Sequence, residues 1–245
     1  MNIVEETENK KKIPLRIIIY LSTVSFLIVG MLVVFALVFV NKRNQTLNEY
    51  YDKKVATFKE ENLSYSKGQI VFLGDSITDF CPLENYYGDL DKKTYNRGIG
   101  GDTTTGVIKR LQVSIYDLEP SEIVLLIGTN DVNHRTSNDA IITNYNYILD
   151  DIKTQLPNSK LFAMSVIPQN YDLTVQSFVD ESNKRIENLN PRIKQVVEER
   201  NYTYLDLFSL VKDESNRLRQ DLSDDGIHFN DAGFKVWANL VKPLL

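Results

Sequence analysis

Residues 71–80 read "VFLGDSITDF", an apolar run that ends in Gly-Asp-Ser. The apolar part, 69–73, shows no alternation of polar and apolar residues, which is typical of a strand covered on both faces. Ser76 stands where the chain leaves the core. A serine in that place either caps the helix that follows or acts as a nucleophile, and the rest of the chain has to separate the two interpretations.

The same pattern of a buried strand followed by a helix recurs along the chain. The other apolar runs lie at 94–96, 122–127, 160–167 and 203–208. The helical periodicities between them lie at 107–118, 137–157 and 175–197. Pro191 falls inside the last of these and is expected to kink or split it. Strands of this kind joined by helices predict a three-layer α/β/α sandwich around a five-stranded parallel sheet, occupying residues 67–245.

A second region precedes this domain. Residues 17–40 contain no charged side chain, and as a helix they would be about 36 Å long, enough to cross a hydrocarbon core of about 30 Å. The run is longer than the apolar part of a signal peptide and no small-x-small cleavage site follows it. We therefore expect one uncleaved transmembrane helix at 17–40, after a tail at 1–16 and before a polar, partly helical stalk at 41–66.

The charges around this span predict its orientation. Those before it are Lys10, Lys11, Lys12 and Arg16, and those after it are Lys42, Arg43, Lys53 and Lys54. Close to the membrane the excess lies on the N-terminal side, which favours a cytoplasmic N-terminus and places residues 67–245 outside the cell.

Composition removes several classes of function. The chain of 245 residues has a formal net charge of −5 and no stripe of Lys and Arg interleaved with aromatics, so nucleic acid is not an expected partner. Its single cysteine, Cys81, allows no intrachain disulfide and no cysteine-based metal site, and is interpreted as an apolar filler. No cofactor and no metal are expected.

A serine nucleophile needs a base, and the chain has only two histidines, His134 and His228. Asp225 precedes His228 by three residues in "SDDGIH", close enough to orient the ring, with Asp224 as a rival. Taken alone, this segment favours a turn that a histidine merely follows. His134 is interpreted as a solvated loop residue.

Acyl transfer also needs donors for the negative charge on the carbonyl oxygen. Two stretches that follow predicted strands could supply them, "NRGIGGDTTTGV" at 96–107 and "LLIGTND" at 125–131, where Asn130 carries a side-chain amide. Each could also be an ordinary turn. However, the carboxyl ends of parallel strands meet at one edge of the sheet, where sites gather.

These four stretches together resemble the SGNH (GDSL) hydrolase family over 70–240. "GDSIT" corresponds to the first block, with Ile77 in place of the more usual leucine, "NRGIGGDTT" to the second, "GTND" to the third and "DGIH" to the last. The resemblance implies a catalytic set of Ser76, Asp225 and His228. It also implies an oxyanion hole formed by the amides of Ser76 and Gly101 and the side chain of Asn130, with Gly100 a less favoured choice than Gly101.

The resulting hypothesis is a membrane-anchored serine esterase that removes short acyl groups, acetyl above all. The short acyl group is expected because the second block resembles the acetylhydrolase branch. The substrate of this esterase would be an ester-bearing small molecule or an acylated glycan or envelope polymer, because the anchor and stalk would hold the site near the cell envelope. The alternatives are a lysophospholipase or lipase, or an O-acyltransferase with the same triad. A metal-dependent phosphoesterase using Asp75, Asn130, Asp131, His134 and His228 is disfavoured, because such sites usually need more histidines and carboxylates than this chain offers. A non-catalytic binding module is disfavoured because every catalytic position is filled.

Overall fold

A computed structural model describes residues 14–170 and 176–245. It divides the chain into two units, residues 1–49 and 50–245. The helix α1, Leu15–Asn62, begins in the first unit, and its last turns belong to the second. An 18-residue stretch of α1 has a mean hydropathy of 2.8 and none of it is buried, so length and composition would allow the helix to cross a membrane. Residues 1–13 of the expected tail lie outside the described residues.

The second unit is built on the predicted parallel sheet. Its strands are β1 (Ile70–Gly74), β2 (Thr94–Gly98), β3 (Glu122–Leu126), β4 (Lys160–Met164) and β5 (Thr203–Leu205). They are arranged in the order β2-β1-β3-β4-β5, and every neighbouring pair is parallel. The register sets Gly74, the last residue of β1, beside Gly98 on one side and Leu126 on the other. The strand carboxyl ends therefore meet at one edge.

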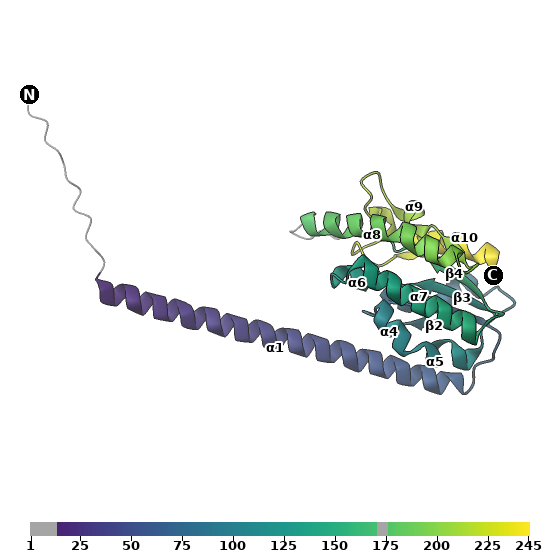
Figure 1. Cartoon of the computed structure of the whole chain (residues 1–245), viewed down its shortest axis with the longest axis horizontal. Helices are drawn as coiled ribbons and strands as arrows, with labels where there is room; N and C mark the ends of the chain where they lie inside the picture. The colour runs from purple at the N-terminus through teal and green to yellow at the C-terminus, as the bar shows by residue number, and fades with distance from the viewer. Residues whose placement is uncertain (1–13, 171–175) are drawn as a thin grey trace, which may run out of the picture. The chain divides into compact units, whose positions relative to one another are not determined.

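Helices cover both faces of the sheet (Figure 1). They are α2 (Ser76–Asp79), α3 (Leu83–Tyr87), α4 (Thr104–Lys109), α5 (Leu111–Ser114), α6 (Thr129–Asn133), α7 (Asn138–Gln155), α8 (Gln176–Glu198), α9 (Leu207–Val211) and α10 (Asp231–Val241), with 3₁₀ turns η1 (Tyr116–Leu118), η2 (Gln220–Leu222) and η3 (Lys242–Leu244). In β1, Val71 packs into one core cluster with Ile148 of α7, whereas Phe72 packs into the other with Trp237 of α10. This two-sided burial explains the missing polar alternation, and it confirms the predicted α/β class.

Three local expectations differ from the structure. The periodicity at 107–118 forms α4, α5 and η1 instead of one helix, because the chain breaks at Arg110, whose buried guanidinium bonds four partners. Pro191 does not split α8, whose Leu189 and Ile193 are both fully buried on either side of it. The strands β4 and β5 are shorter than predicted, and after β5 the side chain of Asp206 caps α9. Residue 175 of the predicted helix lies outside the described residues.

The end of α1 is part of the second unit, which begins at Tyr50, whereas the sequence suggested a domain beginning at residue 67. Phe58 is 2% exposed and packs with Ile99 and Val113. The Arg97 guanidinium lies 4.5 Å from the Phe58 ring centroid and 2.7 Å from a Glu61 carboxylate oxygen. Residues 50–62 therefore pack as part of the second unit.

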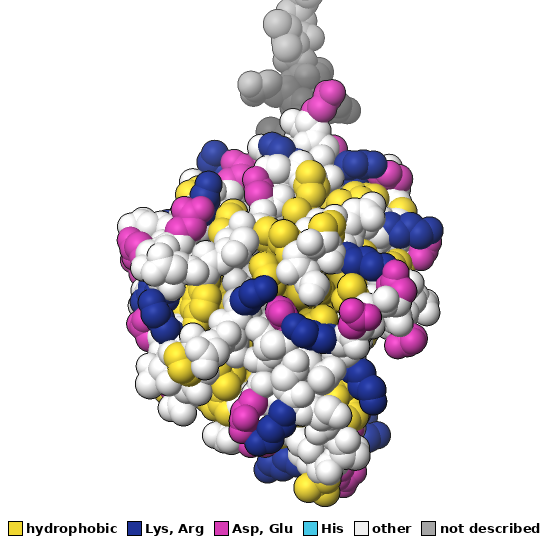
Figure 2. Space-filling model, turned by 90° about the vertical axis from the view of Figure 1, so that its right-hand side faces the viewer, with side chains coloured by type: hydrophobic (Ala, Val, Ile, Leu, Met, Phe, Trp, Pro, Cys, Tyr) yellow, Lys and Arg dark blue, Asp and Glu magenta, His cyan; other side chains and the backbone are white. Residues whose placement is uncertain are grey.

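The surface in Figure 2 carries basic and acidic side chains interspersed with apolar ones. Surface ion pairs on the body, such as Arg200–Asp150 and Arg217–Asp180, have the same mixed character. This distribution agrees with a net charge close to balance.

Candidate active site

Ser76 lies at the carboxyl end of β1, as the first residue of α2. Asp75 caps this helix, since its Oδ1 accepts a hydrogen bond from the Ile77 amide at 3.0 Å. Gly74 is required here because a Cβ on it would lie 2.3 Å from the Leu126 carbonyl oxygen. The tight passage from strand to helix holds the Ser76 hydroxyl at the partly exposed edge of the sheet.

His228 approaches Ser76 from the far end of the chain. Its Nε2 lies 2.8 Å from the Ser76 Oγ, and its Nδ1 lies 2.6 Å from the Asp225 Oδ2. The other carboxylate oxygen of Asp225 accepts hydrogen bonds from the backbone amides of Ile227 and His228. Three side chains thus form one chain of hydrogen bonds from carboxylate to imidazole to hydroxyl, the geometry of a serine nucleophile with an oriented base.

The carboxylate in this arrangement is Asp225, because the side chain of its rival Asp224 instead accepts a hydrogen bond from Asn230. Burial acts to raise the pKa of Asp225, but hydrogen bonds from the His228 ring and from the amides of His228 and Ile227 outweigh it and lower the pKa to about 2. Asp225 is therefore ionised at neutral pH and can stabilise a positively charged imidazole.

The loop after β2 lies beside the nucleophile. Gly101 adopts a φ of +79°, and no described residue accepts a hydrogen bond from its amide. The amide of Gly100 is already engaged, donating to the Asp79 Oδ2 at 2.9 Å. Asn130, at the start of α6, donates one hydrogen of its side-chain amide to the Asp102 carbonyl at 2.9 Å, which leaves the second hydrogen available. The arrangement favours Gly101 over Gly100 as an available donor.

Buried charged side chains hold the loop and the strand ends of this edge together. Arg110 is 1% exposed and donates to the Asp102 carboxylate and to the carbonyls of Gly74 and Arg97, which ties the loop to the ends of β1 and β2. Asp131 accepts from both the amide and the hydroxyl of Thr104. Burial raises the pKa of Asp102 and of Asp131.

Asp75 is the most perturbed of these groups. Burial, opposed by the Ile77 amide and assisted by the charges of Asp102 and Asp131, raises the pKa of Asp75 to about 7. Its Oδ2 is buried, with no hydrogen-bond partner among the described residues. The carboxyl group of Asp75 thus serves as a helix cap and carries a proton through the mildly acidic range.

Sequence reasoning missed several neighbours of the nucleophile. Phe80 is 55% exposed, and its ring centroid lies 5.0 Å from that of His228. Tyr50, Lys54 and Asp79 meet beside Gly100. The i,i+4 spacing of Tyr50 and Lys54 was visible in the sequence, but nothing there showed that their helix packs on the sheet edge.

Other candidates lie elsewhere or have other partners. His134 is exposed at the end of α6. Tyr86 donates to Asp231, and Tyr87 is buried against Phe72. Burial raises the pKa of Cys81 to about 12, which keeps its thiol unreactive. Within residues 14–170 and 176–245, no cluster of three His, Cys, Asp or Glu side chains could hold a metal ion.

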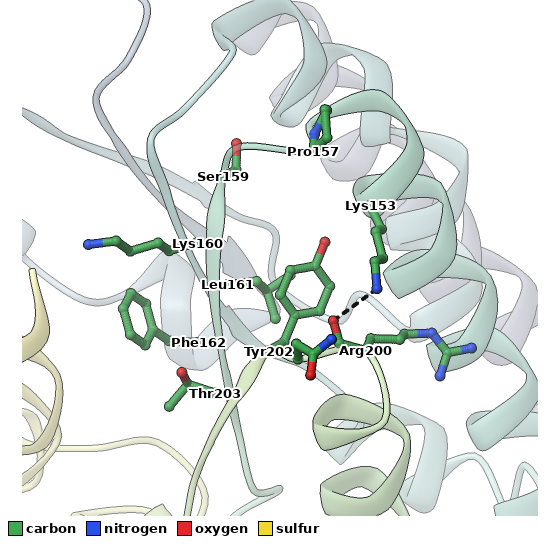
Figure 3. Close-up of a pocket in the computed structure, with 10 residues that line it drawn as sticks. Lys153, Pro157, Ser159, Lys160, Leu161, Phe162, Arg200, Tyr202 and Thr203 are labelled. Atoms are coloured by element: carbon green, nitrogen blue, oxygen red, sulfur yellow. Dashed lines mark hydrogen bonds between the residues drawn. The ribbon is translucent and has the colours of Figure 1, made fainter.

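A hollow of about 310 Å³ lies at the opposite, amino end of the sheet (Figure 3). It is formed where β4 and β5 begin, and Lys153 spans it to donate to the Arg200 carbonyl. Ser159 is on its wall and donates to the Pro120 carbonyl. No histidine lines this hollow, so it lacks the pairing of nucleophile and base that Ser76 has.

Comparison with known proteins identifies the family of the second unit. A model of the GDSL-like lipase/acylhydrolase family matches residues 72–236. The human platelet-activating factor acetylhydrolase IB subunit alpha2 is 29% identical over 103 residues, which are 41% of this chain and 44% of that protein. The chain thus matches less than half the length of this relative.

Solved structures extend the likeness over the whole sheet. A Streptococcus pneumoniae protein described in terms of platelet activating factor is 25% identical, with a TM-score of 0.77 over 84% of this chain and 97% of the other. A GDSL-like lipase from Bacteroides thetaiotaomicron is 22% identical, with a TM-score of 0.67 over 78% and 96%. An acetylxylan esterase from Geobacillus stearothermophilus is 19% identical, with a TM-score of 0.56 over 72% and 93%. The last two share the fold.

Proposed function

The chain belongs to the GDSL-like lipase/acylhydrolase family, which assigns it to the carboxylic ester hydrolases, and we propose that it is a membrane-anchored serine esterase for short acyl groups. The observation that carries this proposal is the continuous hydrogen-bonded series Asp225–His228–Ser76. Its position at the carboxyl edge of a parallel sheet is where such folds bind substrate.

In the proposed mechanism, Ser76 Oγ attacks the ester carbonyl carbon while His228 Nε2 takes its proton. The negative charge on the carbonyl oxygen is stabilised by the amides of Ser76 and Gly101 and by the side chain of Asn130. His228 then gives the proton to the departing alkoxide, leaving an acyl group on Ser76. A water molecule, deprotonated by the same imidazole, releases the acid and restores the serine.

The proposed acyl group is acetyl or similarly short. The connections between elements on the described part of the body are mostly short, so they offer no long apolar lid for a fatty chain. The acetylhydrolase relative acts, by its name, on an acetyl ester. A glycan or envelope polymer is the proposed carrier, because a tethered domain works at a high effective concentration near the membrane.

The test compares esters of increasing acyl length on the full chain in detergent. We expect kcat/KM to fall beyond butanoyl esters and the Ser76→Ala variant to be inactive on all of them. A rise from acetyl to octanoyl would indicate a tunnel, since each buried methylene contributes up to about 0.8 kcal/mol, and would favour a lipase. Acyl transfer to added sugar in preference to water would favour an acyltransferase, and loss of activity on chelation would favour a metallohydrolase.

For localisation, we propose a single span at 17–40 with the N-terminus inside and the body outside. The charge-free run and the basic residues before it support this orientation. Protease added to intact cells should remove the body and leave a small membrane-bound fragment. A body protected until the membrane is opened would reverse the orientation, and a body released without any protease would indicate a cleaved signal.

A further inference from the structure

One nearly buried carboxylate joins three parts of the body. Asp79 ends α2, the helix that begins with Ser76, and its side chain is 6% exposed. Its Oδ1 accepts from Lys54 Nζ at 2.7 Å, and its Oδ2 accepts from Tyr50 Oη at 2.6 Å and from the Gly100 amide at 2.9 Å. The carboxylate therefore links the nucleophile's helix, the end of α1 and the loop after β2.

This loop, residues 99–102, is held on both sides of Gly101. On one side Asp79 fixes the Gly100 amide. On the other side the Asp102 carboxylate accepts from Arg110 Nε at 2.7 Å, and the Asp102 carbonyl accepts from Asn130. Because both neighbours are fixed, the Gly101 peptide is held in one orientation, which is the preorganisation that an oxyanion donor needs.

Tyr50 and Lys54 hold Asp79 in turn. They are four residues apart and so lie on one face of α1. A Cβ built on Gly100 would lie 3.4 Å from the Tyr50 ring and 4.0 Å from the Ser76 Cβ, which places the ring beside the nucleophile. Lys54 balances a charge that would be costly to bury alone. Burial, together with the hydrogen bond to Asp79 and its charge, raises the pKa of Tyr50 to about 12, so its hydroxyl remains a donor at neutral pH.

We propose that Tyr50, Lys54 and Asp79 are positioning residues, which hold the loop 99–102 so that the Gly101 amide faces the carbonyl oxygen of an ester bound at Ser76. The inference rests on the proposed function. Tyr50 and Lys54 lie outside residues 72–236, the part that matches the family, and a chain shortened to begin at residue 67 lacks both. The segment interpreted as a stalk thus contributes to the site.

The experiment measures kcat and KM on a short-chain ester for full-length Asp79→Ala, Tyr50→Phe and Lys54→Met. Since one donor of an oxyanion hole is worth on the order of 10²–10³-fold in kcat, misplacing it should cost about 10–100-fold for Asp79→Ala and several-fold for Tyr50→Phe. KM should change less than about twofold, because the loss falls on the transition state. In the Asp79→Ala background, Tyr50→Phe should cost nothing further.

Tyr51→Phe is the matched control. It removes the same hydroxyl one position along the same helix, where Tyr51 donates to the Gly106 carbonyl at 2.9 Å, and it should retain the wild-type kcat. Wild-type kcat in Tyr50→Phe and Lys54→Met would overturn the inference, even if Asp79→Ala failed to fold. An equal loss in Tyr51→Phe would also overturn it, because the effect would then be general loosening of α1. Activity in Ser76→Ala would instead overturn the proposed function itself.

Discussion

The two ends of the sheet are built from the same strands, yet their polar side chains differ in how deeply they are buried. At the carboxyl end, Ser76 follows β1 and Asn130 follows β3. The side chains of Asp102 and Arg110 at this end are both nearly fully buried. At the amino end, the hollow of Figure 3 is bordered by Arg200, whose ion pair with Asp150 lies at the surface. Both ends contain a serine and basic side chains. The Arg110 guanidinium donates buried hydrogen bonds to Asp102 and to the ends of β1 and β2, whereas the hydrogen bond of Lys153 across the hollow is exposed. This contrast indicates that preorganisation, and not composition, distinguishes the site.

The largest difference between the two ends should appear when each loses its serine. Ser76→Ala removes the nucleophile, and losing one member of such a triad costs roughly 10⁶-fold in kcat. Ser159→Ala at the amino end removes a hydrogen bond to the Pro120 carbonyl and should leave kcat unchanged. Turnover of purified full-length protein on an acetyl ester provides the measurement. If Ser76→Ala kept more than about a tenth of the activity, the serine mechanism would be wrong.

The next effect concerns the orientation of the base. Asp225→Asn keeps the size of the side chain but loses the charge that stabilises the imidazolium, and we expect kcat to fall by on the order of 10⁴-fold. Because the pKa of Asp225 is lowered to about 2, its own titration should not appear in the wild-type pH–rate profile above about pH 4. Asp150→Asn breaks a carboxylate pair at the amino end and is the control. A wild-type acidic limb with its midpoint at about pH 4 that is absent from Asp225→Asn but present in Asp150→Asn would contradict the low pKa of Asp225.

A smaller loss should follow removal of one oxyanion donor. Asn130→Ala should lower kcat by on the order of 10²–10³-fold while KM changes little, because the amide acts on the charge that develops in the transition state. Lys153→Ala removes a comparable single hydrogen bond across the amino-end hollow and should change neither constant. Normal kcat with a raised KM in Asn130→Ala would make Asn130 a residue for substrate binding only.

The sequence was informative about the carboxyl end because its motifs are local. The parallel sheet follows from uninterrupted apolar strands joined by helices. The pairing of Ser76 with His228 was implied by the resemblance of "GDSIT" and "DGIH" to two blocks of the family, together with the presence of only two histidines in the chain. The break at Arg110 could not be predicted in this way, because it depends on a guanidinium that finds carbonyls from two different strands. The role of Tyr50 was hidden for a similar reason, since only the packing of α1 brings it to Gly100. The features that were missed are contacts between distant segments.

The smallest expected effect is on stability and concerns Asp75. Burial raises the pKa of Asp75 to about 7 from an ordinary value of 3.8. Between these two values the folded protein keeps a proton on Asp75 that the unfolded chain releases, so the free energy of unfolding should decrease as the pH rises from about 4 to 7. The raised pKa values of Asp102 and Asp131 act in the same direction.

Asp75→Asn preserves an acceptor for the Ile77 amide and cannot titrate, so it should make this decline shallower. Asp150→Asn is the comparison at the amino end, because its hydrogen bond from Arg200 lowers the pKa of Asp150 and confines its contribution to more acidic conditions. Denaturant midpoints measured between pH 4.5 and 7.5 in detergent should therefore separate the two variants. An unchanged slope in Asp75→Asn would show that Asp75 is ionised in the folded protein across this pH range, which would contradict its raised pKa.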